Sequence, residues 1–146
     1  MALTTAPKAL TGSTRHRWIA AWRSLTHTPH RRAVHAFRLA AERGDGKELA
    51  SLLAPDVAVV VDSGDDEYPT VRVVRGVDDA AVLLMHGLTD PADVVITERP
   101  VNHQPGLVLE RDRERVAVMT MDFIAGLMAV VWIRLQPEKL RHWIHL

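Results

Sequence analysis

Apolar residues recur at intervals of three and four along three stretches of the chain, and this spacing predicts three amphipathic helices. The clearest helix is expected within residues 30–45, and Gly44 suits the position just after its last turn. Its apolar stripe consists of Ala33, Val34, Phe37, Ala40 and Ala41. A second, short helix is expected within residues 46–56, stopped by Pro55. A third is expected over residues 78–88, with two aspartates in a first turn where the helix dipole favours them.

Six further stretches are rich in β-branched and other apolar residues, and they predict strands. Residues 56–64 indicate a buried strand, and residues 70–76 an alternating strand with Arg72 and Arg75 outside its apolar set. Four successive strands follow, over residues 92–101, 106–112, 115–123 and 126–135. The turn residues between them are Pro105 and Gly106, then Asp112, then Ala125 and Gly126. This order is typical of the α+β class, so we expect a cone-shaped domain, a curved and mostly antiparallel sheet of about six strands wrapped around three helices.

The beginning of the chain differs from this middle part. Residues 1–29 are expected to form an N-terminal extension with a short helix that begins near Ser13. That helix carries three apolar residues on one face: Trp18, Trp22 and Leu25. Residues 30–146 are expected to form the cone domain, which ends in a short terminal segment.

Composition narrows the classes of function. The chain has 146 residues, which fits one domain, and a domain of this length buries roughly 68–70% of its unfolded surface. The formal net charge is 0, so the chain lacks the basic excess of a general nucleic-acid-binding protein. The absence of cysteine excludes disulfides, thiolate zinc sites and a cysteine nucleophile. No stretch approaches the roughly 20 apolar residues of a membrane span, and the N-terminus lacks the apolar region of a signal peptide, so a cytoplasmic location is expected.

Four segments, in order, resemble one known family: residues 36–64, 74–88, 101–112 and 136–143. They are similar to the nuclear transport factor 2-like (NTF2-like), or SnoaL-like, superfamily. Within it they are most similar to the C-terminal domain of extracytoplasmic-function sigma factors of actinobacteria. The resemblance covers about residues 33–143. It implies the cone fold and, because cones of this superfamily commonly pair through the outer face of the sheet, a homodimer.

Three departures from the sigma-factor domain matter. After Asp62, Ser63 and Gly64 the sequence is acidic, where the family has a basic, glycine-rich stretch. The tip of the last predicted hairpin, residues 124–128, is apolar where the family has a polar turn. Only about thirty residues precede the resembling part, too few for the DNA-binding and polymerase-binding domains of a sigma factor. We therefore expect a stand-alone cone without a sigma-factor role.

Three titratable residues are candidates for acid–base catalysis. The resemblance implies a general base near the end of the first strand or on a later strand, as in ketosteroid isomerase-like and polyketide cyclase-like members, and Asp62 and Asp122 stand at such places. A carboxylate in an apolar cavity loses hydration, which raises its pKa toward working pH. Alternatively, Asp62 caps a turn and Asp122 closes the last hairpin. His86, late in the third predicted helix, is either an acid–base partner or a surface residue of that helix.

Alternation along residues 115–123 groups Asp122 with Thr120 on one face of a strand and Met119 with Met121 on the other. Which face lines a cavity stays open. The candidate ligand-binding residues are Trp22, Tyr68, Thr120 and Trp132, with core or loop positions as the alternative. The sequence has no metal-site histidine spacing and no phosphate-binding or dinucleotide motif, so neither a metal nor a cofactor is expected.

Two hypotheses follow from these residues. The first is a cofactor-free acid–base enzyme of secondary metabolism, of isomerase, polyketide cyclase or epoxide hydrolase type, with an apolar pocket for a small hydrophobic molecule. The second is a non-catalytic ligand-binding or dimerisation module with a regulatory role, favoured by the lack of a clear carboxylate–histidine set and by the apolar hairpin tip. The sequence leaves open whether the chain is an enzyme. Expected partners are a small hydrophobic molecule and a second copy of the chain, with no nucleic acid and no membrane.

Overall fold

The computed structural model describes residues 29–65, 67–89 and 93–136. The first helix covers residues 29–43; α2 (Gly46–Ser51) follows it, and α3 (Val77–Thr89) comes after the second strand. The six strands are β1 (Leu53–Asp62), β2 (Val71–Arg75), β3 (Val95–Val101), β4 (Gln104–Arg111), β5 (Glu114–Ile124) and β6 (Leu127–Leu135). The predicted α+β order is confirmed. The predicted N-terminal helix and the terminal segment lie outside the described residues.

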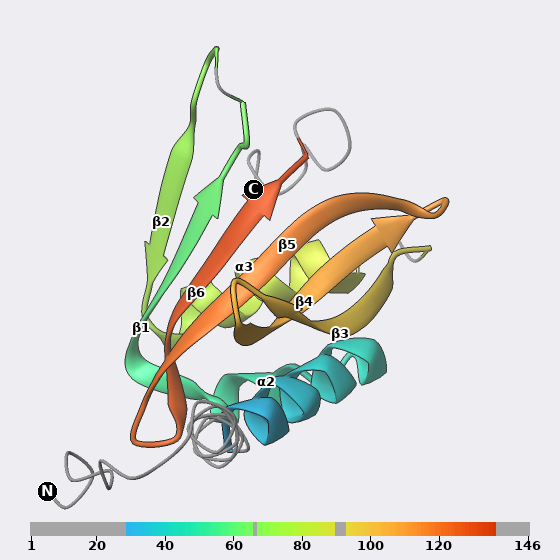
Figure 1. The fold of residues 1–146 in the computed structure, drawn as a ribbon. Coiled ribbons are helices and arrows are strands. Elements are labelled where there is room, and N and C mark those ends of the chain that lie inside the picture. The colour runs from blue at the N-terminus through green and yellow to red at the C-terminus, as the bar shows by residue number, and fades with distance from the viewer. Residues whose placement is uncertain (1–28, 66, 90–92, 137–146) are drawn as a thin grey trace, which may run out of the picture.

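All six strands join one sheet in the order β2-β1-β6-β5-β4-β3. The pair β1 and β6 is parallel, and the other four pairs are antiparallel. The sheet is strongly curved, and the described helices lie on one side of it (Figure 1). The expected cone with a mostly antiparallel sheet is therefore confirmed.

The core fills the space between this concave side of the sheet and the helices. The predicted stripe of the first helix is buried, since Val34, Phe37, Ala40 and Ala41 are each at most 1% exposed. Gly44 has φ +67° after that helix, a conformation that costs glycine little. Asp45 caps α2, because its side chain accepts a hydrogen bond from the Glu48 backbone N–H at 3.1 Å. None of the described helices is long and apolar enough to cross a membrane.

Two predicted breaks are wrong, and both involve proline. Pro55 does not end α2: the helix ends at Ser51, and Pro55 lies inside β1. It is exposed and sits where the register between β1 and β6 shifts, a place where a missing backbone N–H is tolerated. Pro105 and Gly106 lie inside β4, and the turn before them is instead Asn102–His103, whose φ values are +50° and +66°. The predicted turns at Asp112 and at Ala125–Gly126 are confirmed.

Gly106 lies where β4 and β5 come unusually close together. A Cβ at this position would stand 2.6 Å from the Met119 backbone oxygen and 2.9 Å from Val101 Cγ2. Backbone cannot move aside as a flexible side chain can, so Gly106→Ala should lower the free energy of unfolding by about 1–3 kcal/mol. Urea denaturation measures this effect. Gly46→Ala is the matched control: its nearest atom is Met85 Cγ at 3.8 Å, so it should be neutral or stabilising, and an equal loss in both variants would contradict the steric explanation.

Candidate functional site

The interior of the cone is filled by side chains. Phe37, Leu83 and Met119 are fully buried, and Ile133 is 1% exposed. Ser63 is the one buried polar residue in the described part of the chain. None of the predicted site residues that the structure describes is therefore buried in the interior. No group of three or more histidine, aspartate or glutamate residues that could hold a metal occurs within residues 29–65, 67–89 and 93–136.

The opposite side of the sheet carries most of the predicted site residues. Along β1, Val59 and Val61 are buried toward the helices, so the residues that alternate with them project to the other side. Strand register places one row across β2, β1, β6 and β5, namely Val73, Val60, Trp132 and Thr120. The next row consists of Val71, Asp62, Arg134 and Val118. We call the surface formed by Val60, Val71, Val73, Thr120 and Trp132 the outer face.

A hollow of about 430 Å³ lies on this side of the sheet. Its apolar lining comes from Val60, Val71, Val101, Val118, Trp132 and Ile133. Its polar lining comes from Asp62, Asn102, Arg115, Thr120 and Arg134. Three predicted site residues, Asp62, Thr120 and Trp132, thus come together around one concave surface. The alternation of β5 grouped Asp122 with Thr120, and both are on this side, away from the methionines.

Asp122 holds the indole of Trp132. Trp132 Nε1 donates a hydrogen bond to Asp122 Oδ2 at 3.2 Å, and both residues are exposed. Asp62 is half-buried, and its Oδ1 accepts a hydrogen bond from the Gly64 backbone N–H at 2.9 Å, as the turn-capping alternative expects. Each carboxylate therefore has a local partner, and they occupy separate positions on β5 and β1.

The remaining predicted residues lie elsewhere. His86 is half-buried on α3, on the helix side of the sheet. Tyr68 is 72% exposed in the segment between β1 and β2. Neither residue lines the hollow. Trp22 lies outside the described residues.

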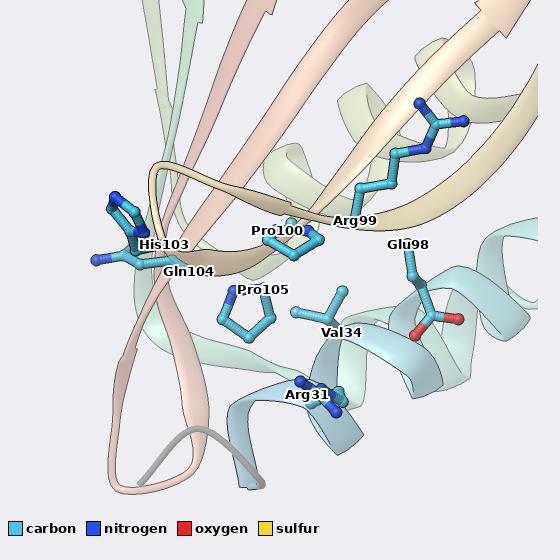
Figure 2. A pocket seen from close by; sticks show the side chains of 9 residues that line it. Arg31, Val34, Glu98, Arg99, Pro100, His103, Gln104 and Pro105 are labelled. Atoms are coloured by element: carbon cyan, nitrogen blue, oxygen red, sulfur yellow. The ribbon is translucent and has the colours of Figure 1, made fainter. Parts of the chain in front are cut away.

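A second concavity, which we call the slot, lies between the first helix and the β3–β4 hairpin. Its volume is about 310 Å³. Its lining comes from Arg31, Val34, Glu98, Arg99, Pro100, His103, Gln104, Pro105 and Gly106. Figure 2 shows Arg31 and Val34 on the helix, the two prolines across from them, and His103 and Glu98 at opposite ends. The slot is therefore built from two elements that are far apart in the sequence.

Glu98 clamps β3 to the first helix. Its Oε2 accepts a hydrogen bond from Arg38 Nε at 2.6 Å and lies 2.8 Å from His35 Nδ1. Arg38 also donates to Glu42 at 2.8 Å. Burial alone would raise the pKa of Glu98, but the hydrogen bonds from His35 and Arg38 outweigh it and hold that pKa below its ordinary value. The carboxylate of Glu98 is therefore ionised and already partnered at neutral pH.

The clamp makes stability depend on pH through Glu98. Because its pKa is lower in the folded state, its contribution is complete above the unfolded pKa of about 4.3 and is lost as pH falls through the folded pKa. Glu98→Gln should lower the free energy of unfolding by about 1 kcal/mol at pH 7, because a partly solvated ion pair contributes no more than this. At pH 3 the same substitution should lower the free energy of unfolding by less. Urea denaturation at both pH values measures the difference. The exposed Glu67, changed to glutamine, is the control and should show no such dependence.

The tip of the last hairpin is apolar, as the sequence indicated. Ile124 is 69% exposed, and the turn residues Ala125 and Gly126 have φ values of +51° and +81°. Next to the tip, Phe123 stacks on His30, with ring centroids 4.4 Å apart and an interplanar angle of 14°. This stacking ties the hairpin to the start of the described first helix. The tip stays a predicted contact surface.

Sequence reasoning missed several residues of these two surfaces. Arg115 and Val71 line the hollow from strand ends and Asn102 lines it from the β3–β4 turn, and only the fold brings the three together. The slot had one signal in the sequence. A two-residue hairpin turn prefers Asn–Gly, and here the turn is Asn102–His103. A bulky residue also occupies the glycine position of the Asp112–Arg113 turn, so this signal alone was too weak to mark the slot.

Several solved structures have a fold similar to that of this chain, including the following three. A candidate ketosteroid isomerase from Kribbella flavida has a TM-score of 0.56 at 19% identity, covering 74% of this chain and 78% of that one. The extracytoplasmic function sigma factor SigJ of Mycobacterium tuberculosis has a TM-score of 0.56 at 22% identity and covers 87% of this chain. An NTF2-like protein of unknown function from Burkholderia xenovorans has a TM-score of 0.55 at 15% identity, covering 74% and 83%.

These likenesses concern the fold. This chain spans 49% of the SigJ chain, and all three identities are below 25%. No family model and no curated protein matches the sequence. Proteins with different described roles thus share this cone, and a fold does not fix a function. The chain has the NTF2-like, or SnoaL-like, fold that its sequence motifs predicted.

Proposed function

We propose that this chain is a non-catalytic binding module that forms homodimers through the outer face of its sheet. The observation that carries the proposal is the exposure of large apolar residues there. Val71 is 60% exposed, and Val73 and Trp132 are each 47% exposed. Val60 lies between Val73 and Trp132 in the same row. Contiguous exposed apolar surface on a soluble domain marks an interaction site.

The chemistry of the outer face suits a second copy of the same chain. A twofold interface brings the same patch of both copies together, so an apolar row meets an apolar row. Trp132 is the expected anchor, since tryptophan is enriched among the residues that dominate binding energy. The formal net charge of 0 leaves little repulsion between copies.

The acid–base enzyme hypothesis has weaker support. It rests on the fold likeness to a candidate ketosteroid isomerase and on the predicted roles of Asp62, Asp122 and His86. Catalysis by a carboxylate uses a water-excluded site, whereas Asp122 is exposed and bonded to Trp132. His86 lies on the other side of the sheet from both carboxylates. These positions favour the non-catalytic alternative, in which Asp122 orients Trp132 within the contact surface.

A small hydrophobic molecule is the second candidate partner of this side of the sheet. The hollow has six apolar lining residues and a volume of about 430 Å³, within the range of small-molecule sites. Its lining includes Val60, Val71 and Trp132, which also belong to the outer face. A molecule in the hollow and a second copy would therefore compete. A hydrophobic ligand of the hollow is expected to dissociate the dimer.

The dimer proposal is tested by a pair of charge insertions. Val73→Arg places a charge at the β2 end of the apolar row of the outer face and should shift the protein to monomer in light scattering after gel filtration. Val82→Arg is the matched control, because Val82 is 62% exposed on α3, on the helix side of the sheet. It should leave the mass unchanged. Equal masses for both variants would reject the outer face as the contact surface.

A further inference from the structure

We propose that the slot between the first helix and the β3–β4 hairpin binds a small carboxylic acid. The carboxylate would pair with Arg31, and an apolar body would extend along Pro100 and Pro105 toward His103. This site is separate from the outer face, so it does not depend on the proposed dimer. The volume of about 310 Å³ is at the lower end for small-molecule sites and fits a short ligand.

The middle of the slot is apolar. Val34 lies beneath it and is 1% exposed, so the apolar surface that a ligand would contact comes mainly from Pro100 and Pro105. Pro100 and Pro105 are opposite each other in the register of β3 and β4, so both rings project on the same side of the hairpin. Figure 2 shows the two rings across from Val34. An aliphatic or aromatic body in this position would leave few hydrogen-bonding groups of the protein unpaired, because proline has no backbone N–H.

Among the charged residues that line the slot, the one without an ion pair to a described residue is an arginine. Glu98 accepts from Arg38 and contacts His35, so its negative charge is already compensated. The Arg99 guanidinium pairs with Glu110 at 3.3 Å, and in Figure 2 it runs away from Arg31. Arg31 has no ion pair within the described part of the chain and is exposed at the edge of the slot. A guanidinium that no described residue pairs with, beside two proline rings, matches a carboxylate on an apolar body.

The far end of the slot is formed by a residue in a strained conformation. His103 has φ +66°, in a turn position where glycine is preferred. Arg113 has the same conformation in the β4–β5 turn, so His103 is singled out by its place in the lining of the slot and not by its φ value. The turn places the His103 imidazole beside Gln104 at the end of the slot opposite Glu98 (Figure 2). We infer that His103 closes the slot over the end of the ligand.

The test uses hexanoate and hexanamide, which share one apolar body and differ in charge. Amide chemical shifts of the full chain are followed by NMR during titration with each compound. Hexanoate should bind with a dissociation constant of about 1 mM, the strength expected of so small a ligand, and shift signals of the slot residues. Arg31→Ala should weaken hexanoate binding about tenfold, the worth of one charge-assisted hydrogen bond. Equal binding of the two compounds, or an unchanged affinity in Arg31→Ala, would overturn the proposal.

His103→Gly separates binding from stability. It relieves the strained φ, so the variant should unfold at the same or a higher temperature, yet bind hexanoate at least about threefold more weakly because a slot wall is lost. Arg113→Gly is the matched control, since Arg113 has φ +67° in the β4–β5 turn at the other end of β4. It should gain stability in the same way and keep its affinity. Unchanged affinity in His103→Gly, or equal losses in both glycine variants, would refute the role of His103.

Discussion

Trp132→Ala is expected to weaken self-association about 30-fold or more, the effect of removing an interface anchor worth about 2 kcal/mol. Trp132 is 47% exposed at the centre of the outer face, between Val60 and Thr120 in one row. Covering the exposed half of so large a ring removes apolar area from water, which favours association. Sedimentation equilibrium over a dilution series measures the change in the dimer dissociation constant.

Asp122→Asn is the control for this prediction. Trp132 Nε1 donates a hydrogen bond to Asp122 Oδ2 at 3.2 Å. Asparagine keeps an oxygen that can accept this hydrogen bond, so the indole should stay in place. The dimer should therefore change little. An undiminished dimer in Trp132→Ala would contradict the anchor role.

Phe37→Ala is expected to lower the free energy of unfolding by about 3–5 kcal/mol, the cost of emptying an aromatic position in a packed core. Phe37 is fully buried and packs within the single cluster that joins the helices to the sheet. For a chain of this size the melting temperature should fall by roughly 10 °C. Urea denaturation and thermal melting by circular dichroism measure both quantities.

The same substitution tests whether the cone is filled. Val82→Ala, at a position 62% exposed on α3, should change stability by no more than about 0.5 kcal/mol. A loss of less than about 1 kcal/mol for Phe37→Ala would mean that its ring lines an open cavity, where no packing is lost. That result would support an interior pocket, which the acid–base enzyme hypothesis requires.

The sequence predicted the elements well because their signals are local. The stripe of residues 30–45 and the turns at Asp112 and Ala125–Gly126 rest on spacing within a few residues. The predicted breaks at Pro55 and Pro105 were wrong for a physical reason. Proline is read as a break, but it is accepted in a strand at an irregular or weakly paired position, and only the neighbouring strand shows which positions those are.

The candidate site was predictable in part. Alternation along β5 correctly separated Asp122 and Thr120 from Met119 and Met121. It did not say which set faces the helices, because that depends on the curvature of the whole sheet. Trp132 and Asp62 join Thr120 only through the register of β1, β5 and β6. The slot depends on contacts between residues about sixty positions apart, such as Arg38 and Glu98, which no local pattern reveals.

The location of the predicted residues changes what they are expected to do. Asp122, first considered as a base in a cavity, lies on an exposed strand and bonds the ring that we propose as the anchor of a dimer. Asp62 holds its own turn. The polar residues of this surface are therefore expected to shape and orient a contact, while the slot on the other side of the sheet is the proposed site of a small carboxylic acid.

Sedimentation equilibrium of the unmodified protein at micromolar concentration tests the central claim most directly. The homodimer predicts a mass of two chains of 16.3 kDa each. Amide hydrogen exchange on the same sample should show protection of β1, β2 and β6 that is lost on dilution. A single chain of 16.3 kDa at every concentration, with no change in exchange, would contradict association through the outer face.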